Sequence, residues 1–300
     1  MTGALLSFSA SALAIRALGS QLNIFEILSI RAGGGLLILL VLAACRPSFR
    51  QKISTRHMGL HAARNTTHFA GQYCWSLAVT VLPFATVFSL EFTMPAWVAL
   101  LAALFLHERI TRSRFGTIVL GFLGVLVIVR PGLESFQPHA LLVLFAAFAY
   151  AISLIITKQL TTHVSTVTII FWMNLMQLPL GLAWPAVVAA TGGPSLFVFR
   201  LGSDLLLPTL VLSVVGVTSH YCLTQAFRSG DATVVVPLDF LRIPLIALVG
   251  WMFYGEALDG FVFAGAGLIV CGVLWNLFAE SRRSRSPVAA STEKAQTAEP

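Results

Sequence analysis

The sequence has little charge for its length. Of 300 residues only 10% are Asp, Glu, Lys or Arg, whereas 57% are hydrophobic, and the mean hydropathy is +0.86. Soluble domains carry about 25% charged residues and about 45–50% apolar ones. A soluble fold of this size would need a large charged surface. The composition therefore excludes a soluble protein and predicts an all-α polytopic membrane protein.

Cysteine is also scarce, and the motifs of several chemistries are missing. The four cysteines lie within apolar runs without CxxC spacing, so we expect buried free thiols. The chain has no P-loop, no HExxH and no G-x-S-x-G, and its His and Cys residues do not cluster at metal-ligand spacing. We therefore expect no enzyme, no ATP-driven pump, no metal and no cofactor.

Long apolar runs are abundant, and each is bounded by charge, Pro or Gly. A membrane-crossing helix needs about 20 mostly apolar residues. Ten segments of this kind are predicted, and their ranges are 3–19, 24–45, 60–81, 84–106, 113–130, 139–157, 165–190, 204–227, 232–254 and 260–279. Residues 281–300 are polar and predicted to form a disordered cytoplasmic tail.

Basic residues are distributed unevenly among the predicted loops. With the N-terminus in the cytoplasm, 13 of the 19 Lys and Arg residues fall in cytoplasmic segments and only 2 on the other side. Cytoplasmic loops of membrane proteins carry such an excess. The net charge of +7 is thus explained by topology and not by nucleic acid. We expect a multi-pass protein of the bacterial inner membrane with both termini in the cytoplasm.

The two halves of the chain resemble each other at an offset of 148 residues. Tyr73-Cys74 aligns with Tyr221-Cys222, Glu91 with Asp239, and Glu108 with Glu256. Five spans per repeat is an odd number, so the second copy must enter the membrane from the opposite side. Inverted repeats of this kind are typical of secondary transporters, whose substrate site lies near the midplane between the repeats. The predicted units are residues 1–132 and 133–280.

Two stretches carry a family resemblance. FSLEFTMPAWVALLAALFLHERIT (88–111) and AFRSGDATVVVPLDFLRIPLIALVGWMFYGEAL (226–258) resemble the half-repeats of the drug/metabolite transporter superfamily, EamA branch. The resemblance implies ten transmembrane helices in two inverted five-helix repeats, both termini in the cytoplasm, and transport by alternating access. The superfamily is broad in its substrates, so the resemblance does not choose a solute.

Three ionisable residues lie at membrane depth in the predicted spans four and nine: Glu91, Asp239 and Arg242. Such residues are costly in the bilayer, by about 2.5–3.5 kcal/mol each on insertion scales. They either form a structural ion pair between the repeats, or bind solute and gate, with Arg242 suited to a carboxylate. Pro95, Pro237 and Pro244 flank these residues and predict kinks in both repeats.

Polar and aromatic residues recur on spans three, seven and eight, and together suit a cavity for a polar, planar or zwitterionic solute. The candidates are Asn65, His68, Gln72, Trp75, Trp172, Asn174, Gln177, His220, Tyr221 and Gln225. For each residue alone, ordinary interhelical hydrogen bonding is an adequate explanation. The histidines and the membrane-depth carboxylates also permit proton coupling.

The remaining charged and small residues receive structural interpretations. Glu26 and Arg31 are expected to pair at the rim of span two, and Glu108 and Glu256 to be solvated helix ends. Glycines along spans five and ten are expected to let two helices approach closely.

We predict a secondary transporter, without ATP hydrolysis, of a small polar metabolite that is amino-acid-like or vitamin-like, for example riboflavin. The alternatives are a passive channel or facilitator, and a membrane scaffold subunit without transport. The expected partners are the solute and the lipid bilayer, with the protein a monomer or a homodimer.

Overall fold

The computed structural model describes residues 2–105, 111–130, 137–190, 203–229 and 242–296. Within these ranges it describes the backbone alone for residues 99, 102, 103, 105, 184–190, 204, 223–229 and 283–296. Its elements are helical. The helices are α1 (Thr2–Leu18), α2 (Ile24–Cys45), α3 (Pro47–Arg50), α4 (Met58–Val81), α5 (Phe84–Glu91), α6 (Met94–Phe105), α7 (Arg112–Val129), α8 (Ala140–Thr161), α9 (Thr166–Ala190), α10 (Ser203–Ser229), α12 (Arg242–Tyr254) and α13 (Gly260–Gln296).

Helix bounds agree closely with the predicted apolar segments, except in spans four and ten; of span nine, the structure describes residues 242–254. In span four the expected continuous helix is divided into α5 and α6, with a break at Phe92 and Thr93. Pro95 has no N–H to donate to the carbonyl of Glu91, four residues earlier. The Thr93 hydroxyl donates to the Leu90 carbonyl at 2.7 Å and so satisfies one acceptor at the break. The predicted discontinuity at Pro95 is thus present just before the proline.

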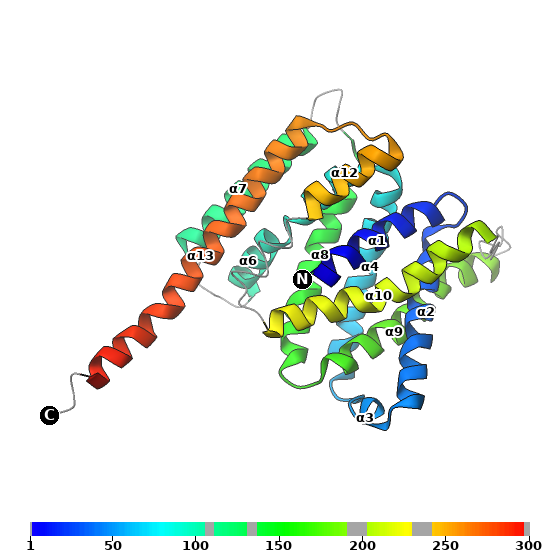
Figure 1. Cartoon of the computed structure of the whole chain (residues 1–300), viewed down its shortest axis with the longest axis horizontal. Coiled ribbons are helices and arrows are strands. Elements are labelled where there is room, and N and C mark those ends of the chain that lie inside the picture. Colours follow the sequence, from blue (N-terminus) through cyan, green and yellow to red (C-terminus); the bar gives the residue numbers. More distant parts are fainter. Residues whose placement is uncertain (1, 106–110, 131–136, 191–202, 230–241, 297–300) are drawn as a thin grey trace.

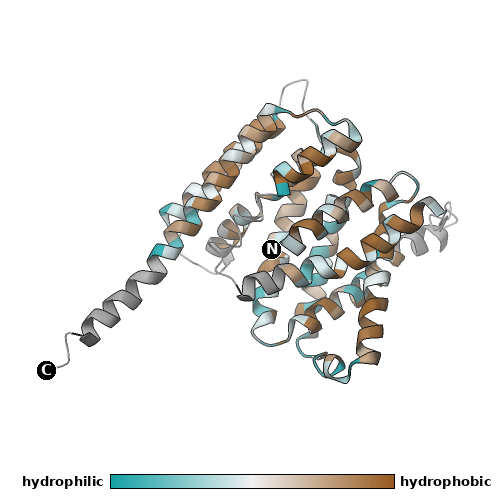
Figure 2. Cartoon of the chain, viewed as in Figure 1, coloured by the Kyte–Doolittle hydropathy of each residue, from teal (hydrophilic) through white to brown (hydrophobic). Residues whose placement is uncertain are grey.

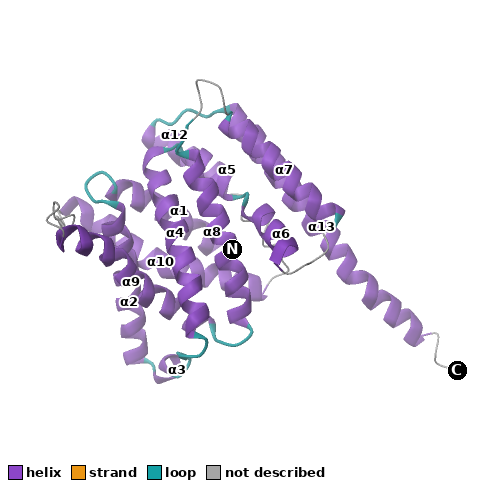
Figure 3. Cartoon of the chain, turned by 180° about the vertical axis from the view of Figure 1, so that it is seen from behind, coloured by secondary structure: helices purple, strands orange, loops and turns teal. Residues whose placement is uncertain are grey.

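The helices pack as a bundle in which elements from the two halves of the chain alternate (Figures 1 and 3). α4 packs along α8 and α1 along α10, while α2 packs along α9 and α7 along α13. The short α5 contacts α12 across the middle of the bundle. Chain segments that are far apart in sequence therefore share one core, which includes Ile15, Phe84, Phe88, Leu90 and Ile246.

Hydrophobic residues occur along most of the helices (Figure 2), and many of their large side chains are exposed. Leu37, Phe115, Leu207 and Phe253 are examples of large hydrophobic residues that are more than half exposed. Among the described residues, six helices are long and apolar enough to cross a membrane, namely Ile24–Cys45, Arg112–Val129, Ala140–Thr161, Thr166–Ala183, Leu205–Cys222 and Gly260–Arg282. In a soluble protein this surface would be unfavourable. It identifies a multi-pass membrane protein.

The four cysteines are free, as predicted, but they are not all buried. Cys45 and Cys271 are exposed, and Cys74 and Cys222 are partly exposed. The expectation of uniform burial was wrong because an apolar helix in a membrane protein places apolar side chains on its outer face as well as its inner one.

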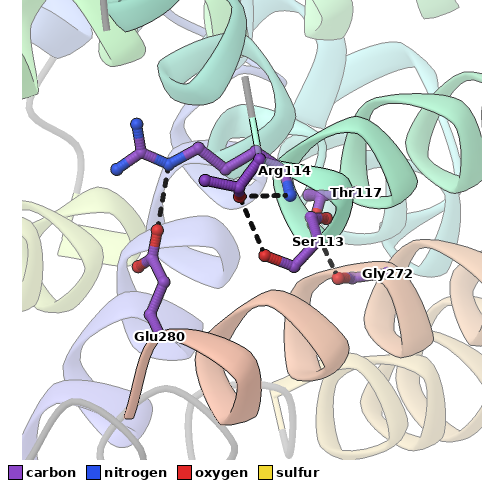
Figure 4. A network of polar contacts seen from close by, with 6 residues as sticks. Ser113, Arg114, Thr117, Gly272 and Glu280 are labelled. Atoms are coloured by element: carbon purple, nitrogen blue, oxygen red, sulfur yellow. Dashed lines mark hydrogen bonds and ion pairs between the residues drawn. The ribbon is translucent and has the colours of Figure 1, made fainter. Parts of the chain in front are cut away.

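Glycines bring α7 and α13 into close contact. A Cβ atom on Gly124 would lie 2.6 Å from the carbonyl oxygen of Gly265, so neither position has room for a side chain. About two turns along, the Thr117 hydroxyl donates to the Gly272 carbonyl at 2.7 Å. An ion pair between Arg114 and Glu280, 2.9 Å apart, closes the end of this contact (Figure 4). The predicted close approach of these two helices is confirmed.

α13 continues beyond its apolar part to Gln296 and extends away from the bundle (Figure 1). The sequence predicts disorder for the polar stretch 281–300, whereas residues 281–296 are helical in the structure.

Candidate functional site

An ion pair at the centre of the bundle joins the two halves of the chain. Glu91 is the last residue of α5 and Arg242 the first of α12, and their charged atoms Oε1 and NH1 lie 3.8 Å apart. The indole N–H of Trp75, on α4, donates to the other oxygen of Glu91 at 2.8 Å. The Arg242 side chain is 5% exposed and that of Glu91 is 17% exposed. The structure thus brings together three of the predicted site residues.

Aromatic rings surround the Arg242 guanidinium. Its central carbon lies 4.7 Å from the centre of the Phe8 ring, 5.2 Å from Phe92 and 5.6 Å from Phe88. Rings at this distance attract a cation through their negative faces. Glu91 ends α5, and Phe92 lies in the break before α6. A charged pair enclosed by flat rings suits a solute with both a polar edge and a planar face.

A second polar cluster lies about two turns before Trp75 on α4, around His68. Gln177, on α9, contacts His68 at 2.9 Å and lies 3.5 Å from Arg31 of α2. Arg31 also contacts Nε2 of His220, on α10, at 3.1 Å. The rings of His68 and His220 lie 5.4 Å apart. Phe8 contacts His220 as well as Arg242, and therefore separates this cluster from the ion pair.

The predicted polar face of span three is present. Asn65, His68, Gln72 and Trp75 are all nearly buried, as expected for residues three or four positions apart on one side of a helix. Asn65 donates to the Trp172 carbonyl at 3.2 Å. Gln72 donates to Ser76 on its own helix at 3.3 Å. Only His68 and Trp75 of this face reach the two central clusters.

Other predicted site residues lie elsewhere. The Trp172 indole donates to the Ser54 carbonyl in the loop before α4, and Asn174 donates to Ile170 on its own helix. Tyr221 is 47% exposed, because it lies about 100° around α10 from the inward-facing His220. These three residues are not part of the central clusters.

The predictions on Asp239 and Pro237 fall on residues outside those described, as does the side chain of Gln225. Pro244 is the third residue of α12. The residues just before Arg242 are not among those described, so the kink predicted at Pro244 stays a prediction.

A third charged cluster, which we call the Arg16 latch, closes one end of the bundle. Arg16 of α1 pairs with Glu256, which follows α12, and its Nε donates to the Val79 carbonyl at 2.7 Å. Glu256 also accepts the backbone N–H of Phe84, the first residue of α5, at 2.8 Å. The guanidinium carbon lies 3.4 Å from the centre of the Phe84 ring. The latch therefore fastens α1, α4 and α5 to the end of α12.

This cluster corrects the expectation that Glu256 is a solvated helix end. Its side chain is only 12% exposed, and its partner is 240 positions away. Glu108, its counterpart in the repeat, lies outside the residues described. Sequence reasoning missed the partner because no local pattern connects Arg16 to Glu256.

The expected rim pair of Glu26 and Arg31 is likewise not formed. Glu26 accepts the backbone N–H of Asn23 in a capping box at the start of α2. Arg31 instead points to Gln177 and His220. Five positions correspond to about 500° around a helix, so the two side chains leave α2 on different sides. Arg31 is thus a central residue that the sequence interpretation assigned to the rim.

Two cavities lie at the end of the bundle that the latch closes. One, of about 390 Å³, is lined by Gly19, Asn23, Phe25, Tyr73 and Thr80. The other, of about 200 Å³, is lined by residues that include Thr86, Arg130 and Asp259. Both cavities lie beside the ends of α4 and α5, outside the central clusters. The described residues contain no group of three or more His, Cys, Asp or Glu side chains able to hold a metal ion.

Comparison with known proteins supports transport. The EamA-like transporter family matches residues 1–130 and 137–278. A riboflavin transporter of Rhizobium johnstonii is 32% identical over 235 residues, which cover 78% of this chain and 74% of that protein. A riboflavin transporter of Brucella anthropi is 30% identical, covering 78% and 81%. An S-adenosylmethionine uptake transporter of Rickettsia felis is 26% identical, covering 93% and 91%.

A solved crystal structure shares the fold. It superposes with a TM-score of 0.60 at 18% sequence identity and covers 94% of this chain and 96% of its own. The match extends over almost the whole chain, so the helical arrangement described above is that of a known fold. The chain belongs to the EamA-like transporter family and is a secondary transporter of small metabolites.

Proposed function

We propose that the protein moves its solute by alternating access between two inverted five-helix repeats, in the bacterial inner membrane and with both termini in the cytoplasm. The observation that carries this proposal is the Glu91–Arg242 pair, which joins the repeats where the helix of span four is broken. Broken helices with charged groups at mid-membrane form the substrate sites of many secondary transporters.

The packing of the helices supports inverted repeats. Taken in chain order, the counterparts in the two halves are α1 and α8, α2 and α9, α4 and α10, α5 and α12, and α7 and α13. Exchanging each helix for its counterpart converts the contact of α4 with α8 into that of α10 with α1. It also converts the contact of α2 with α10 into that of α9 with α4. The pairs α2 with α9, α5 with α12 and α7 with α13 exchange with themselves. Contacts that map onto each other in this way are expected of two related halves about a twofold axis.

The Arg16 latch supports a conformation closed at one end. With the proposed orientation, the ends of α1, α4 and α12 that the latch joins face the periplasm. The structure then corresponds to a state that is closed to the outside, and opening it requires the Arg16–Glu256 pair to separate. A latch that breaks and re-forms is one of the two-state elements that alternating access needs.

For the solute we propose a vitamin-like or amino-acid-like metabolite, with riboflavin as the first compound to test. Two of the relatives are riboflavin transporters. The rings of Phe8, Phe88 and Phe92 around Arg242 suit a planar heterocycle.

The test is counterflow in liposomes that contain the purified protein and unlabelled riboflavin. We expect labelled riboflavin outside to accumulate transiently, because a carrier exchanges solute across the membrane. Glu91→Gln and Arg242→Gln should reduce this exchange about tenfold or more, by loss of an interaction with a charged group. Arg114→Gln, which removes the α7–α13 ion pair, is the matched control.

Linear flux without trans-stimulation would instead indicate a passive facilitator. Flux that is unaffected by both central substitutions would remove the Glu91–Arg242 pair from the transport cycle. Imposing a pH gradient in the same assay tests proton coupling, for which Glu91, His68 and His220 provide titratable groups near the centre.

A further inference from the structure

Two arginines lie buried inside the bundle without a carboxylate partner among the residues described. Arg31, on α2, is 4% exposed, and Arg64, on α4, is 5% exposed. The contacts of Arg31 are with Gln177 and His220. Arg64 donates to the Thr157 hydroxyl at 3.2 Å and to the Asn65 side-chain oxygen at 2.9 Å. All of these partners are neutral amides, hydroxyls or imidazoles.

The hydrogen-bond directions fix the imidazoles as neutral. A guanidinium has donors and no acceptor, so Nε2 of His220 must present a lone pair to Arg31. Gln177 accepts from Arg31 with its oxygen and therefore donates its amide N–H to Nδ1 of His68. Neither histidine carries a charge in this arrangement. The positive charge of Arg31 is consequently solvated by dipoles but not balanced by an anion within the described structure.

The fold also reserves space for this side chain. A Cβ atom on Gly216 of α10 would lie 3.0 Å from Cγ of Arg31, so the stem of the arginine rests directly on the glycine backbone. Arg31 has five N–H donors and contacts two acceptors. An interhelical bond alone would need only an amide, whereas an ionised guanidinium at membrane depth carries an insertion cost that an amide lacks.

The cluster lies inside the bundle, away from the ends of the helices that form it. Arg31 is the eighth residue of α2, about 10 Å from the start of that helix, and Gln177 lies about 16 Å along α9. His68 is seven residues, about 10 Å, from Trp75, which contacts Glu91. The cluster is thus formed by helices of both halves, next to the ion pair proposed to bind solute.

We propose that Arg31, with Arg64 one turn before His68 on α4, forms an anion subsite that receives a carboxylate or phosphate group of the transported solute. The guanidinium provides paired N–H donors for such a group, Gln177 and the histidines orient it, and the ion pair beyond Phe8 binds the other end of the molecule. The proposal rests on the transport function above and predicts that, among vitamin-like and amino-acid-like metabolites, those with an anionic group bind more tightly than neutral ones such as riboflavin.

The experiment compares binding of matched pairs that differ by an anionic group: flavin mononucleotide with riboflavin, nicotinate with nicotinamide, and pantothenate with pantothenol. Purified protein is titrated with each compound and its thermal unfolding is followed, because a bound ligand stabilises the folded state. We expect the anionic member of at least one pair to bind about tenfold tighter or more. The flavin arm reports a phosphate and the other two report a carboxylate.

Three variants test the role of Arg31. Arg31→Gln should abolish the preference for the anion, and without solute it should raise the unfolding temperature, because it removes an unbalanced charge. Gly216→Ala keeps the charge but displaces the side chain, so it should weaken the preference without raising that temperature. Arg46→Gln changes an exposed arginine at the end of the same helix and should alter neither quantity.

Equal or tighter binding of the neutral members would overturn the proposal, as would an anion preference that survives Arg31→Gln. If wild-type protein binds no compound in the panel, the unfolding temperature of Arg31→Gln without solute decides between an anion subsite and a structural role. A decrease or no change in Arg31→Gln would then show a structural role and overturn the subsite. Failure of counterflow together with Arg31-dependent anion binding would refute alternating access and leave the subsite in place.

Discussion

Replacing Glu256 by glutamine tests the Arg16 latch with little change in side-chain volume. Glu256 accepts hydrogen bonds from Arg16 and from the Phe84 N–H, and its side chain is 12% exposed. The glutamine keeps one oxygen but loses the negative charge. Because the latch joins α1 and α5 to the end of α12, the substitution should favour a conformation in which this end is open.

The magnitude follows from the two bonds. Hydrogen bonds to charged groups contribute about 1.5–3 kcal/mol, and neutral ones about 0.5–1.5 kcal/mol. Losing the charge from two bonds at a nearly buried site therefore disfavours the closed state by about 2 kcal/mol. A free-energy change of 1.36 kcal/mol corresponds to a factor of about ten, so the open population should rise about 30-fold.

The assay measures the rate at which a membrane-impermeant maleimide labels a cysteine behind the latch. Ser89 is fully buried on α5, about one and a half turns from Phe84, and Ser89→Cys is a small change. With the four native cysteines replaced, labelling from outside requires the latch end to open. We expect Glu256→Gln to accelerate labelling about 30-fold, in proportion to the open population.

Glu280→Gln is the matched control, since it removes the charge of the Arg114 pair at the end of α7 and α13. It should leave the labelling rate unchanged. An unchanged rate in Glu256→Gln, in protein that is otherwise folded, would refute the assignment of this pair as a latch. Equal acceleration in both variants would show general loosening and would refute it as well.

Two further substitutions test the central pair and the α7–α13 contact. Trp75→Phe removes the N–H that donates to Glu91 and should reduce solute counterflow several-fold while leaving the unfolding temperature within a few degrees; an unchanged flux would show that this bond does not position Glu91. Gly124→Val places methyl groups against the Gly265 carbonyl and should lower stability by about 1–3 kcal/mol, measured by thermal unfolding. Gly267→Val is its control, because a Cβ there meets nothing within 4 Å, and equal losses in the two variants would contradict the packing argument.

Helix positions were predictable from the sequence because apolar length is a direct requirement of the bilayer. The predicted segment 24–45 coincides with α2, and 84–106 covers α5 and α6 with Pro95 marking the break. The polar face of span three was predictable too, since residues three and four positions apart must share a side of the helix. These features depend on local pattern alone.

The partners of charged residues were not predictable in the same way. Arg16 and Glu256 are 240 positions apart, and only the folded bundle brings them together. Arg31 was assigned to Glu26 because that was the nearest opposite charge in sequence, whereas its contacts lie on α9 and α10. Pairing between helices depends on their rotation and tilt, which composition and spacing do not specify.

α12 connects the central pair to the latch. Arg242 at its start contacts Glu91, and at its other end the ring of Tyr254 packs against Phe84 at 5.4 Å, beside Arg16. The helix is 13 residues long, about 18 Å, and α5 lies alongside it. A solute that competes for Arg242 weakens the contact of α5 with α12 at the centre, and a stiff helix transmits that displacement to its far end.

Solute binding should therefore open the latch. Riboflavin is expected to raise the labelling rate of Ser89→Cys in protein that lacks the four native cysteines and keeps Glu256, and to lose this effect when Glu91→Gln is added. Because coupling between two equilibria is reciprocal, Glu256→Gln should change the affinity for riboflavin by the same factor by which riboflavin changes the opening of the latch. Unequal factors, measured by titration and by labelling in one preparation, would show that the two events are not linked through α12.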